Sequence, residues 1–72
     1  MTTLYFTVAN YRREKYRPTH FGEDPAQEWN KFLTLLKENF SSVTNYEWIY
    51  FDFTDPADEA FFLVWASDGI VI

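Results

Sequence analysis

The amino-acid sequence predicts one small α+β domain over residues 1–72, in which a single amphipathic helix packs on one face of a three- or four-stranded sheet, mixed or antiparallel. Seventy-two residues are enough for one domain only. One segment repeats its apolar side chains at the period of a helix, and others have the alternation or the composition of strands. We therefore expect the element order β-α-β-β, with a further short strand at the end.

The first expected element is a strand over residues 2–9. Its apolar side chains alternate, so that Leu4, Phe6 and Val8 share the face that we expect to be buried. Tyr5 points to the opposite face.

Residues 10–23 break this alternation, and Pro18 and Gly22 indicate a long loop, although its first half is also compatible with a longer strand or a turn of helix. So long a loop is uncommon in a small domain unless it has a function. Three roles stay open for it: a solvated connector, an arm that binds phosphate or RNA, or a partner of the acidic half of the chain. The basic residues of this loop are Arg12, Arg13, Lys15 and Arg17.

Residues 25–40 are expected to form the helix. Asp24 is a suitable N-cap, and Pro25 fits the first helical position. Leu35 lies about 60° outside the apolar stripe of this helix. The stripe itself consists of Ala26, Trp29, Phe32, Leu33, Leu36 and Phe40.

Residues 46–53 have the aromatic and β-branched composition of a second strand. In the expected arrangement Ile49, Phe51 and Phe53 face the helix, and the alternate side chains face away from it.

Two interpretations compete for residues 60–67. The sequence Asp55-Pro56 resembles the cap at Asp24-Pro25 and would begin a second helix. Against this, residues 61–66 are apolar on every side, and Asp68-Gly69 is typical of a hairpin turn. We therefore expect a strand over residues 60–67, followed by a short edge strand over 70–72, and keep the helix as the alternative.

The charge is strongly asymmetric. The net charge is −5, and residues 41–72 hold six acidic residues and no Lys or Arg. Such a balance opposes binding to nucleic acid and to anionic membranes. No apolar run approaches the roughly 18–20 residues of a membrane span, and no signal-peptide pattern is evident, so we expect a cytoplasmic protein without membrane association. The acidic surface is expected at Asp52, Asp55, Asp58 and Glu59.

The sequence offers little for catalysis. It has no cysteine, a single histidine (His20) and two glycines, which leaves no thiolate or histidine metal site, no phosphate-binding loop and no supported nucleophile–base pair. The carboxylates Asp52, Asp55, Asp58 and Glu59 are close in sequence but lack the ordered spacing and central glycine of a calcium loop. We expect no enzyme activity, no cofactor, no metal and no small-molecule substrate.

The aromatic content indicates a binding surface instead. Sixteen aromatic residues are more than one helix and one sheet face can bury, and exposed apolar patches mark interaction sites. We therefore expect a non-enzymatic protein-binding module that contacts itself, as a homodimer, or a larger host protein. The expected interface residues are Tyr5, Tyr46, Trp48 and Tyr50 on the outer sheet face, with Leu35 beside them.

Two other functions are open. The first is a small acidic inhibitor that mimics nucleic acid, of the type that phages and mobile elements use against host defence systems such as CRISPR, with a basic nucleic-acid-binding host protein as its target. The second is a phosphate- or RNA-binding module that uses the basic loop.

Overall fold

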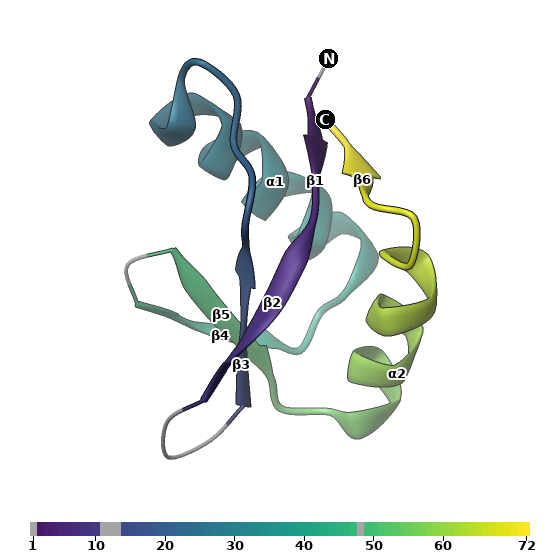
Figure 1. The fold of residues 1–72 in the computed structure, drawn as a ribbon. Coiled ribbons are helices and arrows are strands. Elements are labelled where there is room, and N and C mark those ends of the chain that lie inside the picture. Colours follow the sequence, from purple (N-terminus) through teal and green to yellow (C-terminus); the bar gives the residue numbers. More distant parts are fainter. Residues whose placement is uncertain (1, 11–13, 48) are drawn as a thin grey trace.

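The computed structural model describes residues 2–10, 14–47 and 49–72, and Figure 1 shows their arrangement. The described residues form an α+β domain, as predicted, in which two helices pack with a four-stranded antiparallel sheet and a second sheet has two strands. The elements are β1 (Thr3–Leu4), β2 (Phe6–Asn10), β3 (Glu14–Pro18), α1 (Pro25–Asn39), β4 (Val43–Glu47), β5 (Tyr50–Phe53), α2 (Pro56–Trp65) and β6 (Ile70–Val71).

The four-stranded sheet has the order β2-β3-β5-β4, and every neighbouring pair is antiparallel. The predicted strand over 2–9 is found as two pieces, β1 and β2, separated by Tyr5. β1 pairs with the predicted last strand, β6, in the second sheet. The two ends of the chain therefore lie side by side (Figure 1).

The loop predicted over residues 10–23 is wrong over Glu14–Pro18, which is strand β3. β3 lies between β2 and β5 and pairs with both. Tyr16 and Pro18 are buried, whereas Lys15 is half-buried and Arg17 is exposed. The period-two alternation was thus present, but the basic residues and the proline obscured it. Pro18 is the last residue of the strand and has no N–H to donate.

The single strand predicted over 46–53 is also wrong. Residues 43–53 form the hairpin β4–β5, in which Glu47 pairs with Tyr50. Ile49 lies in the turn of this hairpin. The continuous β composition of this segment did not reveal where the chain reverses.

Helix α1 confirms the prediction to within one residue at its end. The side chain of Asp24 accepts a hydrogen bond from the Gln27 N–H at 3.2 Å, and Pro25 is the first helical residue. Phe32 and Leu36, from the predicted apolar stripe, are fully buried.

The strand predicted over 60–67 is wrong, because Pro56–Trp65 is helix α2. The alternative based on the cap was the correct one: the Asp55 side chain accepts a hydrogen bond from the Ala57 N–H at 2.9 Å. Gly69 has a positive φ of 87°, but the turn leads to β6 and not to a hairpin with residues 60–67.

The core consists of aromatic rings between the sheet and both helices. Phe32 of α1 and Phe62 of α2 each pack on Phe6 and on Phe51, with centroid distances of 5.1 to 5.4 Å. Because both helices reach the same sheet residues, they cover the same face of the sheet.

The other face of the sheet is mostly polar, so the predicted aromatic face is not found in the described residues. Thr7 pairs with Arg17, and Thr44 pairs with Asp52, each on the side opposite the buried rings. The Arg17 guanidinium lies 5.5 Å from the centre of the Tyr50 ring.

Candidate functional site

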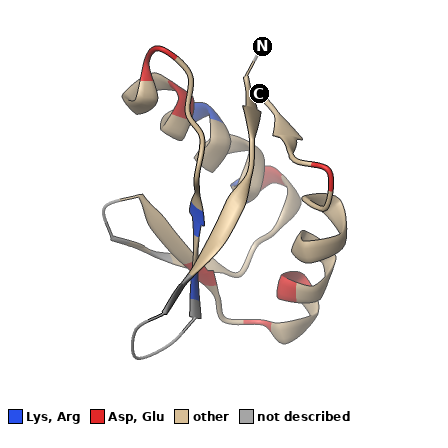
Figure 2. Ribbon diagram, viewed as in Figure 1, with Lys and Arg blue, Asp and Glu red and all other residues tan. Residues whose placement is uncertain are grey.

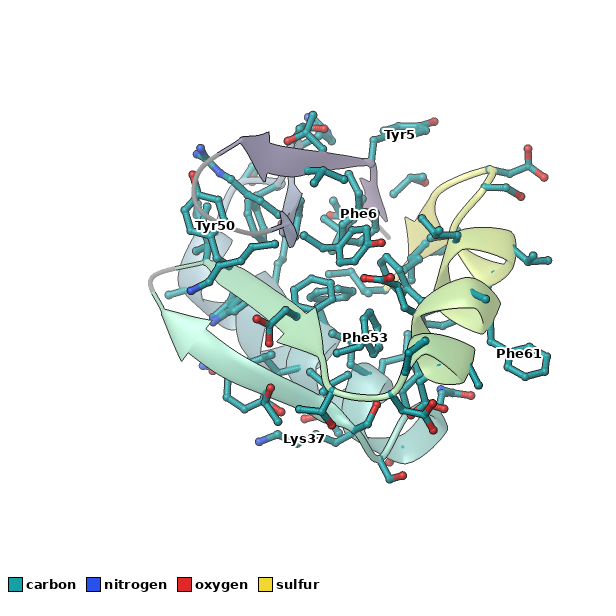
Figure 3. The ribbon with its side chains drawn as sticks, turned by 90° about the horizontal axis from the view of Figure 1, so that it is seen from below. Tyr5, Phe6, Lys37, Tyr50, Phe53 and Phe61 are labelled. Atoms are coloured by element: carbon teal, nitrogen blue, oxygen red, sulfur yellow. The ribbon has the colours of Figure 1, made fainter. Side chains whose placement is uncertain are left out.

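The outward side of α2 is the most exposed apolar surface of the described chain. At about 100° per residue, the arc opposite the buried Phe62 contains only apolar side chains. Phe61 is 69% exposed, Val64 75% and Leu63 53%. Figure 3 shows Phe61 pointing away from the body of the domain. We call this arc the α2 outer face: it consists of Ala57, Ala60, Phe61, Leu63 and Val64.

Helix α1 provides an internal comparison. On its solvent side it carries Gln27, Lys31, Thr34 and Glu38, as a surface helix normally does. Helix α2 has no polar residue on the corresponding arc. Its two charged residues, Asp58 and Glu59, are on the flanks nearer to the domain and are half-buried.

The α2 outer face has apolar neighbours. Trp65, which is 36% exposed, packs on Phe40 at 5.3 Å and borders the face at the last turn of the helix. Tyr5 lies against the turn that follows α2, since a Cβ at Gly69 would be 3.0 Å from the Tyr5 ring. In Figure 3 the Tyr5 side chain and α2 are on the same side of the molecule.

The described residues of the predicted interface have different surroundings. Tyr50 lies beside Arg17 on the polar sheet face, with its hydroxyl 3.4 Å from the Arg17 guanidinium. Leu35 is half-buried against the core. Trp48 is outside the described residues.

Tyr46 is also directed elsewhere, toward the end of α1. Its hydroxyl donates a hydrogen bond to the Val43 carbonyl at 2.9 Å, and the Lys37 ammonium lies 5.0 Å from the centre of its ring. Burial raises the pKa of this tyrosine. The ring is 41% exposed, and its contacts are with Lys37 of α1 and with its own strand.

Three of the four predicted acidic-surface residues have structural partners. Asp55 caps α2. Asp52 is 7% exposed and accepts a hydrogen bond from the Thr44 hydroxyl at 2.9 Å. Asp58 accepts two hydrogen bonds from Ser42, from the hydroxyl at 2.8 Å and from the N–H at 3.2 Å. These contacts account for much of the acidic pattern without a basic, nucleic-acid-binding target protein. The inhibitor function stays a prediction.

The structure describes two of the four residues of the predicted basic loop. Lys15 and Arg17 belong to β3 and lie on the polar sheet face. Arg12 and Arg13 are outside the described residues. A phosphate- or RNA-binding role for these residues is therefore still a prediction.

A further carboxylate, Glu28, connects three segments and was not found from the sequence. It accepts hydrogen bonds from the Thr2 hydroxyl at 2.6 Å and from the Gly22 N–H. The hydrogen bond from Thr2 is the largest influence on the pKa of Glu28 and lowers it. Desolvation acts in the opposite direction but is outweighed, because the Gly22 hydrogen bond and the positive charges of Lys31 and His20 also lower this pKa. These hydrogen bonds connect Thr2 and Gly22 to helix α1.

Comparison of the chain with protein-family models, with curated proteins and with solved structures found no match. Among the described residues, neither helix has the length and apolar character that crossing a membrane requires. The fold and the surface thus define a class, a small α+β domain with one apolar helix face turned to solvent.

Proposed function

We propose that this protein is a non-enzymatic protein-binding module that acts through the α2 outer face. The observation that supports the proposal is the exposure of Phe61, Leu63 and Val64 on an arc without a polar residue. Burial of one such side chain contributes roughly 1.5–3 kcal/mol. Contiguous exposed apolar patches larger than a few hundred Å² are characteristic of interaction sites.

The proposal differs from the sequence-based expectation in the surface that it uses. The excess of apolar side chains is found on α2, and the sheet face that was expected to bind carries Arg17, Tyr50 and Asp52. Interface energy is usually concentrated in a few central side chains. Phe61 and Val64, the most exposed of the set, are the candidates for that role.

A site-specific crosslinking experiment tests this function. A photoreactive phenylalanine analogue replaces Phe61, and in a control protein it replaces Thr7 on the polar sheet face. We expect a crosslinked protein from the position-61 reagent that the control does not capture. Mass spectrometry identifies it, so that the interaction can be reconstituted from purified components.

Affinity measurements on the reconstituted pair then decide the proposal. We expect the double variant Phe61→Ser/Val64→Ser to bind roughly 10- to 100-fold more weakly. Val8→Ser is the matched control, because Val8 is an exposed valine of β2. Circular dichroism verifies that both variants are folded. Unchanged affinity of the double variant would exclude the α2 outer face as the binding site.

A further inference from the structure

Carboxylates surround the α2 outer face and indicate the chemistry of its partner. We propose that the face binds a cationic amphipathic helix of another protein, whose apolar stripe covers the face and whose Lys or Arg side chains contact the surrounding carboxylates. This inference rests on the proposed function and adds the class of the partner.

Four acidic residues occupy the border of the face, and we call them the acidic rim. Asp55 precedes the first turn of α2, and Asp68 follows its last turn. Asp58 lies on the flank next to Phe61, and Glu59 on the flank next to Leu63, by the helical period. Figure 2 shows acidic segments at both ends of α2 and no basic segment in it.

The surroundings of the rim reinforce its negative charge. Residues 38–72 contain no Lys or Arg. The last turn of α2 has no basic residue, so the partial negative charge of its terminal carbonyls is not offset by a side chain of its own. An approaching cation therefore meets carboxylates and a helix C-terminus together.

Part of the rim is held in position and part is available for new bonds. Hydrogen bonds from Ala57 and Ser42 fix Asp55 and Asp58. Within the described residues, the carboxylates of Glu59 and Asp68 make no hydrogen bond or ion pair. Fixed and available acceptors around an apolar centre match the usual interface pattern of an apolar core with a polar border.

The shape of the site favours a helix as the occupant. α2 has ten residues, a length of about 15 Å. The side chains at positions 57, 60, 61 and 64 form ridges three and four residues apart, onto which the i, i+3, i+4, i+7 stripe of a second helix packs at 8–10 Å between axes. A partner of two to three helical turns covers the whole face.

A second copy of this chain is a poorer match. Packing two α2 outer faces together would bring two acidic rims into contact, and like charges across an interface are costly. An anionic lipid surface would be repelled by the same carboxylates.

Three labelled 18-residue model peptides test the inference by fluorescence anisotropy. One has a leucine stripe flanked by lysines, the second has the same stripe flanked by glutamates, and the third is a scrambled lysine peptide without a stripe. We expect the first peptide to bind at least tenfold more tightly than the other two, and its affinity to fall as salt is raised.

Variants of the protein separate the contribution of the apolar face to peptide binding from that of the acidic rim. Phe61→Ser/Val64→Ser should abolish binding of the first peptide. The rim variant Glu59→Gln/Asp68→Asn should weaken it severalfold. The control Glu23→Gln/Glu38→Gln removes the same net charge from two exposed carboxylates outside the rim and should leave the affinity nearly unchanged. Equal losses in the rim variant and its control would overturn the inference.

The remaining outcomes separate this inference from the proposed function. Equal binding of the lysine and glutamate stripe peptides through Phe61 and Val64 would refute the cationic partner and leave the α2 outer face as a protein-binding site. The cationic-helix inference would also be refuted if the scrambled peptide bound tightly or if none of the three peptides bound. In either case the crosslinking experiment would still decide the proposed function independently.

Two further measurements examine the other occupants. Light scattering that shows a dimer lost in Phe61→Ser/Val64→Ser would assign the face to a second copy. Co-sedimentation with phosphatidylcholine vesicles that depends on the same residues would assign it to lipid. Either result would overturn the inference, and we expect neither.

Discussion

Phe61 and Phe62 are consecutive residues of α2 with opposite environments: the side chain of Phe62 is 1% exposed, and that of Phe61 is 69% exposed. The Phe62 ring packs at right angles on Phe6 and Phe51, with centroid distances of 5.2 and 5.4 Å. Substitutions at these two neighbours therefore separate the contribution of the core from that of the surface.

Phe62→Ala should lower the free energy of unfolding by about 3–5 kcal/mol, because it leaves a cavity among packed rings. Phe61→Ala should change it by less than about 0.5 kcal/mol, as is usual for an exposed position. Urea denaturation followed by circular dichroism measures both. A loss at Phe61 as large as that at Phe62 would mean that the outer face is covered within the protein itself.

The Asp55 cap should contribute measurably to stability. Asp55→Ala removes the acceptor of the Ala57 N–H and is expected to cost about 1 kcal/mol. Asp55→Asn keeps a capping oxygen and should recover most of the loss. If both variants were as stable as the parent protein in urea, the cap would not be what fixes the start of α2.

Gly69→Ala should destabilise the junction between α2 and β6. The positive φ of 87° is unfavourable for alanine, and a Cβ there would lie 2.7 Å from Thr3 Cγ2 and 3.2 Å from the Leu4 carbonyl oxygen. We expect a loss of about 1–3 kcal/mol in thermal or urea unfolding. Ser67→Ala, an exposed change in the same turn, is the control and should have little effect.

The lowered pKa of Glu28 predicts a pH dependence of stability. A carboxylate whose pKa is lower in the folded than in the unfolded protein stabilises the fold above its ordinary value of 4.5, and this contribution is lost as the pH falls through the folded pKa. Glu28→Gln should therefore reduce the loss of stability on acidification below that pH. Identical acid unfolding curves for the parent and the variant would contradict the role of the Thr2 and Gly22 hydrogen bonds.

The two helices show how far the sequence could predict the fold. For α1, the cap at Asp24 and the apolar period agree, so the sequence allows one interpretation. For α2, the cap at Asp55 indicates a helix, but residues 61–66 are apolar on every side and fit a strand equally well. Contacts distant in sequence, such as that of Asp58 with Ser42, contribute to the choice and are not visible in a local pattern.

The exposed apolar surface could be predicted in amount from the sequence, but not in its location. The composition indicated more apolar side chains than the fold could bury, and Phe61, Leu63 and Val64 are exposed in the structure. The location of these side chains could not be predicted, because residues 60–67 were assigned to a strand and form part of helix α2. The repeated Asp-Pro-Ala sequence at Asp24 and Asp55 was the signal that could have placed them.

The pairing of β1 with β6 has a consequence for the order of folding. The hairpins β2–β3 and β4–β5 join residues that are close in sequence, whereas Thr2 and Ile72 exchange backbone hydrogen bonds of 3.3 and 2.9 Å across nearly the whole chain. Closing so large a loop has the greatest entropic cost, and this entropy is lost before the contacts between β1 and β6 can stabilise the chain. We therefore expect this pair of strands to form after the rate-limiting step, so that Ile70→Val accelerates unfolding and leaves the folding rate nearly unchanged.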